Sequence, residues 1–248
     1  MSEEVQDAVN VVGLSKWFGE RKVLSGVSFA VRRLETVGLL GPNGAGKTTI
    51  MRIIAGVLRQ DAGRVSIEGV DVASGRDYAI RKIGYMPEKP PLYRELTVAA
   101  YLRFWARLRD VPRHEVDDRV QTVISSAGLD DVRNITTRKL SKGYGQRLNL
   151  AQAIVHDPSV VILDEPTSGL DPDQIVKTRE LIFSLGTKKT LIISSHILAD
   201  VAKTCDRVII INAGRVVGES LPALESEKES AERITSLERL YLETVHNM

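Results

Sequence analysis

The sequence contains very little cysteine: Cys205 is the only one among 248 residues. An internal disulfide is therefore impossible, and this usage is typical of proteins that fold in a reducing compartment. A lone cysteine is more often a small buried hydrophobic side chain than a reactive thiol, and we expect Cys205 to be buried.

Long hydrophobic runs are also absent. The longest apolar runs, residues 160–163 and 208–211, have the length of strands, whereas a membrane-spanning helix needs about 20 apolar residues. Residues 1–4 are acidic in character and no apolar stretch follows them, so a secretory signal is not predicted. We expect a soluble chain, which would need partners for any role at a membrane.

Neither sign of charge is in excess. Lysine and arginine number 34 against 32 aspartate and glutamate residues, which gives a formal net charge of +2. This balance provides no broad basic surface of the kind that nucleic-acid binding requires, so no nucleic acid is expected as a partner. The length suits one sizeable core or one domain with a smaller subdomain, and the 43% hydrophobic content is ordinary for a soluble globular protein.

Short apolar runs that end in turn residues alternate with helical patterns along the chain. This alternation predicts an α/β fold with a mostly parallel sheet covered by helices. Segments 27–31 and 65–71 have instead the pattern of antiparallel strands. The expected buried strands are 36–40, 160–163, 190–194 and 208–211.

The pattern changes between residues 87 and 155, where two amphipathic helices, 95–108 and 115–127, follow each other without an intervening strand. Pro90 and Pro91 form a stiff extended hinge at the start of this region. We therefore expect a helical insertion between two halves of an α/β core. The expected units are a core of 1–86 and 156–222, a helical subdomain of 87–155 and a tail of 223–248.

The tail begins with many glutamate and serine residues and ends in a helical pattern. Its apolar residues recur at helical spacing, so they are expected on one face that packs on the core or on a partner. They are Ile234, Leu237, Leu240 or Tyr241, and Val245.

Residues 41–48, GPNGAGKT, fit the phosphate-binding pattern G-x-x-x-x-G-K-[ST] without exception. A buried strand precedes the segment, and a helix, expected at 49–58, follows it. This context argues against a chance glycine-rich turn between a strand and a helix. Glycines let successive backbone N–H groups face a phosphate, and the helix N-terminus adds partial positive charge. Lys47 is expected to pair with the β- and γ-phosphates of a nucleotide, and the Thr48 hydroxyl to ligate Mg²⁺. The residues expected to contact the nucleotide here are Gly41, Pro42, Asn43, Gly44, Ala45, Gly46, Lys47, Thr48 and Thr49.

Two carboxylates, Asp164 and Glu165, follow the expected strand 160–163. They lie at the edge where open α/β sheets bind ligands. Because successive strand residues point to opposite faces, one carboxylate can hold Mg²⁺ while the other polarises an attacking water. An acidic strand end by itself is more often a solvated edge or a helix cap, so this interpretation depends on the phosphate-binding loop.

Three further segments complete an ordered set of motifs: 140–147 (LSKGYGQR), 164–171 (DEPTSGLD) and 193–196 (ISSH). Together with the phosphate-binding loop, they resemble the ATP-binding subunits of ATP-binding cassette (ABC) transporters, from about residue 9 to about residue 220. The resemblance implies a P-loop NTPase core, an antiparallel β subdomain and an α-helical insertion that carries the signature motif 140–147.

The resemblance also implies catalytic roles. Glu165 matches the general base, Asp164 matches the carboxylate that holds Mg²⁺, and His196 matches the group that reaches the γ-phosphate. Lys47 completes the catalytic set. Without the family, a lone histidine after a strand would more often be structural.

Four residues are implied to bind nucleotide outside the loop. Phe18 matches the aromatic that stacks on adenine, although it could be a core aromatic and Trp17 is a rival. Ser141 and Gly143 would contact the γ-phosphate of an ATP on the opposite subunit, and Asp171 lies in the loop that crosses between subunits. Ser141 and Asp171 also suit helix N-caps, with a proline after Asp171 at the first helical position.

Two parts of the sequence depart from the family pattern. Lys142 and Tyr144 replace a glycine and a glutamine of the signature, and Glu88 stands where the family generally has a glutamine that ligates Mg²⁺ and the attacking water. A carboxylate can still ligate a hard cation, so Glu88 joins Thr48 and Asp164 in the expected metal set. Both departures, with residues 92–98, resemble a bacterial exporter subgroup that has separate ATPase subunits.

The function implied by the resemblance is ATP hydrolysis coupled to transport, with ATP and Mg²⁺ as ligands. Two copies of the chain would bind head-to-tail around two ATP and drive membrane-spanning partner subunits from the cytoplasmic face of the cell membrane. One alternative is a soluble ABC-type ATPase without a transport role, against which the single cassette and the lack of heptads argue. Another is a regulatory nucleotide-binding module with little turnover. A GTP-binding switch is disfavoured because the sequence contains no Asn-Lys-x-Asp segment.

Overall fold

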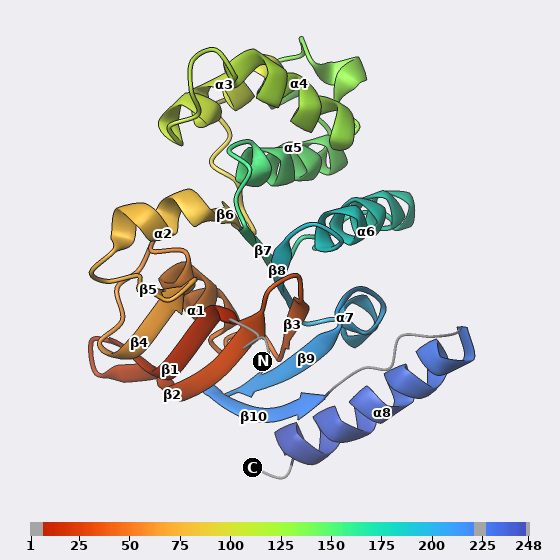
Figure 1. Cartoon of the computed structure of the whole chain (residues 1–248). Helices are drawn as coiled ribbons and strands as arrows, with labels where there is room; N and C mark the ends of the chain where they lie inside the picture. The colour runs from red at the N-terminus through yellow and green to blue at the C-terminus, as the bar shows by residue number, and fades with distance from the viewer. Residues whose placement is uncertain (1–6, 221–226, 247–248) are drawn as a thin grey trace, which may run out of the picture.

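The computed structural model describes residues 7–220 and 227–246 of the chain. Two β-sheets form the centre, and helices cover the larger sheet (Figure 1). Residues 1–6, which include the acidic segment at residues 1–4, lie outside the described residues. The start of the predicted tail, residues 223–226, lies outside them as well.

The larger sheet has the strand order β10-β9-β3-β8-β7-β6, and its neighbours are parallel except for the pair β9 and β10. Its strands are β3 (Thr36–Leu40), β6 (Ile83–Met86), β7 (Val160–Asp164), β8 (Thr190–Ser195), β9 (Arg207–Asn212) and β10 (Arg215–Ser220). The prediction of an α/β fold with a mostly parallel sheet is confirmed, as are its four expected strands. Sequence analysis missed β6, which is short and interrupted by a glycine, and β10, which is largely polar.

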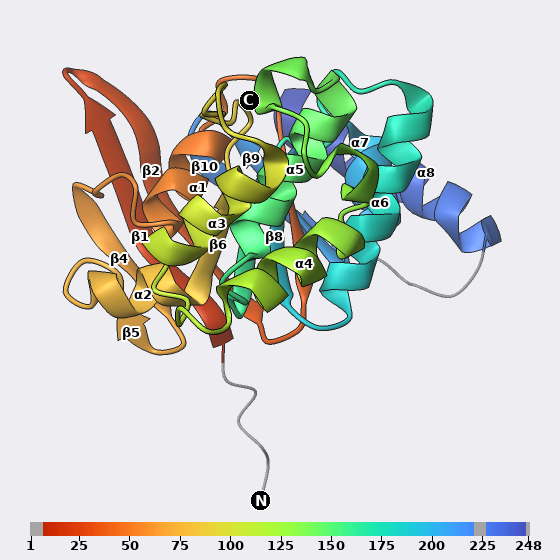
Figure 2. The same ribbon diagram turned by 90° about the horizontal axis from the view of Figure 1, so that it is seen from above.

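The smaller sheet is antiparallel throughout and has the order β2-β1-β4-β5. Its strands are β1 (Asp7–Phe18), β2 (Arg21–Arg32), β4 (Ala62–Ile67) and β5 (Val70–Asp71). The expected antiparallel segments are therefore confirmed. The long β1–β2 hairpin and the C-terminal helix lie on opposite sides of the molecule in both views (Figures 1 and 2).

Alternate residues of the parallel strands enter two separate hydrophobic clusters. In β7, Val161 and Leu163 pack with the helices of one face, whereas Val160 and Ile162 pack with the antiparallel sheet and the first helix. This is why the parallel strands of the larger sheet are apolar at most positions.

The first helix, α1 (Lys47–Ile54), differs from its predicted range of 49–58 at both ends. It begins at Lys47, directly after the left-handed Gly46, and its regular part ends before Gly56, which has a φ of 68°. The N–H of Leu58 bonds back to the carbonyl of Arg52, which closes the helix end. A glycine C-cap therefore overrides the apolar pattern that continues to residue 58.

Three helices in the region 87–155 pack on one another and form a cluster above the sheets (Figure 1). They are α3 (Val98–Leu108), α4 (Val116–Ser126) and α5 (Lys142–Ile154). The helix expected at 95–108 begins later, at Val98, because the Thr97 hydroxyl accepts the N–H of Ala100 and caps it. Short 3₁₀ turns at Asp130–Val132 and Thr137–Lys139 connect α4 to α5.

The remaining helices are α2 (Arg76–Lys82), α6 (Pro172–Gly186), α7 (Leu198–Thr204) and α8 (Glu227–His246). Helix α8 packs on α7 and β10. Its Leu237 is buried, and Ile234 and Tyr241 pack against the same core, as the predicted apolar face required. Among the described residues, no helix combines the length and apolar content that crossing a membrane needs.

Cys205 follows α7 and is buried, as expected from the sequence. Burial raises the pKa of its thiol, so the reactive thiolate is disfavoured. The side chain of Arg233, on α8, donates a hydrogen bond to the carbonyl oxygen of Cys205. The C-terminal helix is thereby fixed to the end of α7.

His156 follows α5 and is held as a neutral ring. Its Nε2 lies 3.1 Å from the carbonyl oxygen of Ile83, and its Nδ1 is buried without a hydrogen-bond partner among the described residues. A proton added to Nδ1 would therefore have no acceptor there. Burial, with the charge of Arg109 adding to it, lowers the pKa of His156 from its ordinary 6.5 to about 4.

We predict that His156 makes folding stability fall as the pH falls between about 6.5 and about 4. In this window the unfolded chain takes up the proton and the native chain does not, so the loss reaches about 2 kcal/mol near pH 5. His156→Gln should lose this dependence while keeping a donor for Ile83, as measured by urea unfolding at a series of pH values. His114→Gln, at an exposed position, is the control, and identical pH profiles for all three proteins would contradict the assignment.

Candidate active site

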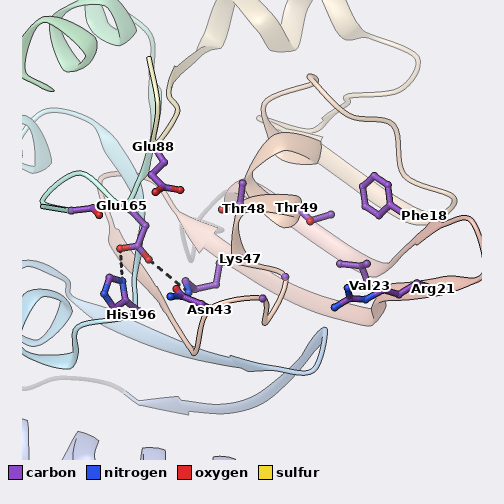
Figure 3. Close-up of a pocket in the computed structure, with 13 residues that line it drawn as sticks. Phe18, Arg21, Val23, Asn43, Lys47, Thr48, Thr49, Glu88, Glu165 and His196 are labelled. Atoms are coloured by element: carbon purple, nitrogen blue, oxygen red, sulfur yellow. Dashed lines mark hydrogen bonds and ion pairs between the residues drawn. The ribbon is translucent and has the colours of Figure 1, made fainter. Parts of the chain in front are cut away.

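A pocket of about 530 Å³ lies beside the carboxyl ends of β3, β7 and β8 (Figure 3). The phosphate-binding loop and the two strand ends after β7 and β8 form one part of it, and the tip of the β1–β2 hairpin forms another. Its lining residues are Phe18, Arg21, Val23, Asn43, Gly44, Gly46, Lys47, Thr48, Thr49, Glu88, Glu165, Ser168 and His196.

The phosphate-binding loop has a backbone that requires glycine. A Cβ on Gly41 would lie 2.1 Å from the carbonyl oxygen of Ile211, and Gly46 has a φ of 107° directly before α1. The loop therefore delivers the N-terminus of α1, with its partial positive charge, to the pocket. Pro42 and Ala45 belong to the loop without lining the pocket, as does Gly41.

Lys47 lies across the loop. Its Nζ donates hydrogen bonds to the carbonyl oxygens of Gly41 at 2.7 Å and Pro42 at 3.2 Å, and it is 3.7 Å from Oε1 of Glu165. Burial lowers the pKa of Lys47, while the charges of Glu165 and Asp164 oppose that change. The ammonium group is thus held by carbonyl oxygens of the loop, which are acceptors that a phosphate could replace.

Asp164 lies buried beneath the pocket. Its Oδ1 accepts hydrogen bonds from Ser194 Oγ at 2.7 Å and from Thr48 Oγ1 at 3.1 Å. Its Oδ2 is buried without a hydrogen-bond partner among the described residues. Burial raises the pKa of Asp164, and the charge of Glu88, on the pocket wall, adds to the rise. A bound cation would offset both the cost of burying the Asp164 charge and its repulsion from Glu88.

The oxygens of Thr48, Asp164 and Glu88 therefore fit a hard cation such as Mg²⁺. Within residues 7–220 and 227–246, no group of three or more histidine, cysteine, aspartate and glutamate side chains could hold a metal by itself. A cation at this site would have to take its remaining oxygens from water and from a bound phosphate, which is how Mg²⁺ is commonly held at nucleotides.

Glu165 is held in an unusual backbone conformation. Its φ is 50°, in the left-handed region, and its N–H donates to Ser194 Oγ at 2.9 Å. Its Oε2 lies 2.9 Å from Nδ1 of His196, so the carboxylate is placed between His196 and Lys47 (Figure 3). Strain of this kind persists only where surrounding contacts enforce it, and it is concentrated at functional sites.

The tip of the β1–β2 hairpin gives the pocket its aromatic wall. Phe18 is 50% exposed and lines the pocket, so the alternative of a core aromatic is wrong. Trp17 lies outside the lining and packs instead with the Nζ of Lys22, 4.7 Å from its ring centroid. Arg21 pairs with Phe18 across the hairpin and also lines the pocket.

Sequence analysis missed Arg21, Val23 and Ser168 as pocket residues. Ser168 belongs to the 164–171 motif, so its proximity to Glu165 was a usable signal. Arg21 follows a two-residue turn after Phe18, and recognition of that hairpin register would have placed it opposite the aromatic.

Ser141, Gly143 and Asp171 do not line this pocket in the described chain. The Ser141 hydroxyl accepts the N–H of Tyr144 at 3.4 Å and caps α5. The Asp171 carboxylate accepts the N–H of Gln174 at 2.9 Å and caps α6. Both N-cap predictions are confirmed. Gly143 is buried against the side chain of Gln174, where a Cβ would lie 2.4 Å from its Oε1.

Residues 24–168 match a protein-family model described as ABC transporter. An ABC transporter ATP-binding protein of Methanocaldococcus jannaschii is 37% identical over 210 residues, which cover 84% of this chain and 76% of that protein. The Nod factor export ATP-binding protein I of Rhizobium sp. (strain N33) is 34% identical over 216 residues, 87% of this chain and 71% of that protein.

Solved structures of ABC transporter cassettes are also similar to most of this chain. The ATP-binding subunit of an ABC transporter superposes with a TM-score of 0.82 and 33% identity, covering 96% of this chain and 99% of that one. A dimeric bacterial ABC transporter cassette has a TM-score of 0.79 and 25% identity, covering 88% of this chain and all of that one. A post-hydrolysis state of a cassette bound to ADP and Pi has a TM-score of 0.78 and 25% identity over the same shares.

We predict that Glu88→Gln strengthens ATP binding without Mg²⁺ and raises the Mg²⁺ concentration that ATP binding needs. Without the metal, ATP should bind about 2- to 5-fold more tightly, because an exposed, screened carboxylate no longer repels the phosphates. The Mg²⁺ concentration that half-saturates ATP binding should rise by a similar factor, because one anionic ligand is lost. Calorimetric titration of ATP without Mg²⁺ and at a series of Mg²⁺ concentrations measures both effects. Glu88→Asp, which keeps the charge, is the control, and wild-type values for Glu88→Gln in both conditions would exclude Glu88 from the site.

Proposed function

The chain belongs to the ABC transporter family of ATP-hydrolysing, ATP-binding subunits, and we propose that two copies bind head-to-tail around two ATP molecules to drive membrane-spanning partner subunits. In this proposal the subunit acts at the cytoplasmic face of the cell membrane. Export is the proposed direction, and it is supported by the similarity to Nod factor export proteins. The division into a core, a helical subdomain of 87–155 and a tail is part of this proposal.

One observation carries the head-to-tail arrangement. The phosphate-binding loop, Glu165 and His196 share one pocket, whereas Ser141 and Gly143 stand outside the lining of that pocket in the described chain. Ser141 is exposed and begins a helix, and a helix N-terminus with a hydroxyl suits an anionic phosphate. This supports a role for the signature at the pocket of a second copy. A γ-phosphate there would hold two subunits together through charge-assisted hydrogen bonds from both sides.

For hydrolysis we assign Glu165 as the general base. Its carboxylate can take a proton from a water that attacks the γ-phosphate, and the 2.9 Å contact with His196 holds it in one orientation. Lys47 would leave the loop carbonyls for the β- and γ-phosphate oxygens, and His196 would meet the γ-phosphate from the other side. Phe18 would stack on the adenine.

Thr48, Asp164 and Glu88 are the residues that would hold Mg²⁺. When bound, the ion would neutralise charge on the β- and γ-phosphate oxygens. Asp164 supports this assignment because one of its carboxylate oxygens is buried without a partner among the described residues.

Loss of the γ-phosphate would remove the bridge between the copies, so the dimer would open. The cluster of α3, α4 and α5 carries the signature at the start of α5, and Gln146 on α5 donates to the carbonyl oxygen of Pro166, next to Glu165. A change at Glu165 can therefore reach the helical cluster directly, which supports this cluster as the part that moves the partners.

We predict that Mg-ATP hydrolysis rises faster than linearly with protein concentration, because each site needs two copies. Glu165→Gln should lower the rate about 10²- to 10⁴-fold while ATP still binds, since only proton transfer is lost. Phosphate release measures the rate, and size-exclusion chromatography with ATP should show a trapped dimer for the variant. A rate proportional to concentration would contradict the shared site, and normal turnover by Glu165→Gln would exclude it as the base.

The proposed partners have their own test. Affinity capture of the chain from detergent-solubilised membranes of its source should recover membrane-spanning subunits in an ATP-dependent complex. Recovery of nucleic acid without membrane protein would favour the soluble ATPase alternative.

A further inference from the structure

Two short segments of the active site are joined at both of their ends. One follows β7 and runs from Glu165 to Thr167, and the other follows β8 and runs from His196 to Asp200. At one end, His196 Nδ1 lies 2.9 Å from Glu165 Oε2. At the other end, Thr167 Oγ1 donates to Asp200 Oδ2 at 2.6 Å. The two contacts close a ring that contains the proposed base and the proposed γ-phosphate group.

The second contact is buried and charged. Thr167 is 7% exposed and Asp200 is 8% exposed. A buried carboxylate is costly unless its oxygens are paired, and the other oxygen of Asp200 accepts from Arg179 on α6. Asp200 therefore connects the loop after Glu165, helix α6 and helix α7. Removing either partner of the Thr167–Asp200 bond would leave a buried polar atom unsatisfied.

The ring of contacts can hold Glu165 in its strained backbone conformation. A left-handed non-glycine residue persists only when the surrounding contacts over-determine it. The Glu165 N–H donates a hydrogen bond to the Ser194 hydroxyl. The Gln146 side chain donates to the carbonyl oxygen of Pro166. The Thr167 hydroxyl donates to the Asp200 carboxylate. Ser194 lies two residues before His196 and Asp200 lies four residues after it, so their contacts connect the segment of Glu165 to the chain on both sides of His196.

We infer that Thr167 and Asp200 are positioning residues that fix Glu165 and His196 relative to each other. This inference rests on the proposed function of Glu165 and His196. Neither Thr167 nor Asp200 lines the pocket. Their loss should therefore change the rate of hydrolysis while leaving the binding of ATP almost unchanged.

The first test removes only the hydroxyl of Thr167. Thr167→Val should lower kcat about 10- to 100-fold, the scale of a small displacement of a catalytic group, with KM for ATP within about 2-fold of the wild type. Thr167→Ser keeps the hydroxyl and should restore most of kcat. The matched control is Thr178→Val on α6, because Thr178 is 2% exposed and its hydroxyl has no hydrogen-bond partner in the described part of the chain.

The second test does not depend on turnover. In the nucleotide-free protein, hydrogen exchange of the amides at 165–170 and 196–200 should be faster in Thr167→Val and in Asp200→Asn than in the wild type. Thr178→Val should leave both segments unchanged. Melting temperatures of all variants establish that exchange reports the local segments rather than general unfolding.

The possible outcomes distinguish a failure of the positioning role from a failure of the proposed function. If the wild type hydrolyses ATP, Glu165→Gln does not, and Thr167→Val keeps its full kcat, the positioning role is wrong. If Thr167→Val raises KM as much as it lowers kcat, or if exchange at 196–200 is unchanged, the role is also wrong. A wild-type protein that never hydrolyses ATP contradicts the proposed function, and the exchange experiment then still decides whether the ring couples its two segments.

Discussion

The buried carboxylate of Asp164 is the constraint on which the geometry of the site depends. A charge in this position needs partners, and it finds them in Ser194 on β8 and Thr48 on α1. The Ser194 hydroxyl that donates to Asp164 also accepts the N–H of Glu165. Three elements that are distant in the sequence are thereby brought to one point. The positions of the phosphate-binding loop and of the proposed base follow from that point.

The packing of the larger sheet explains why the candidate active site lies at its edge. Its central strands are buried on both faces, with alternate residues in two apolar clusters, and this leaves no room for polar side chains along their length. Functional groups can appear only where the strands end. The parallel arrangement brings the ends of β3, β7 and β8 together, so the loop, Glu165 and His196 meet there.

Local patterns in the sequence were enough to predict four buried strands, the strand-loop-helix setting of residues 41–48 and both helix caps. Short or polar elements escaped: β6 contains a glycine, β10 is half-exposed, and the glycine cap at Gly56 ended α1 before its apolar pattern did. Contacts between distant segments escaped for a different reason. Thr167 and Asp200 are 33 residues apart, and nothing in either segment marks the other as its partner. The roles of the site residues themselves stay predictions.

The left-handed φ of Glu165 limits what mutagenesis at this position can teach. Residues branched at Cβ are the least compatible with such a backbone, so valine, isoleucine or threonine here would displace the chain that leaves β7. An inactive variant of that kind would report a moved backbone and carry no information about proton transfer. Saturation libraries at residue 165 therefore confound geometry with chemistry, and their results should be ranked by backbone compatibility before any charge or hydrogen-bonding trend is drawn from them.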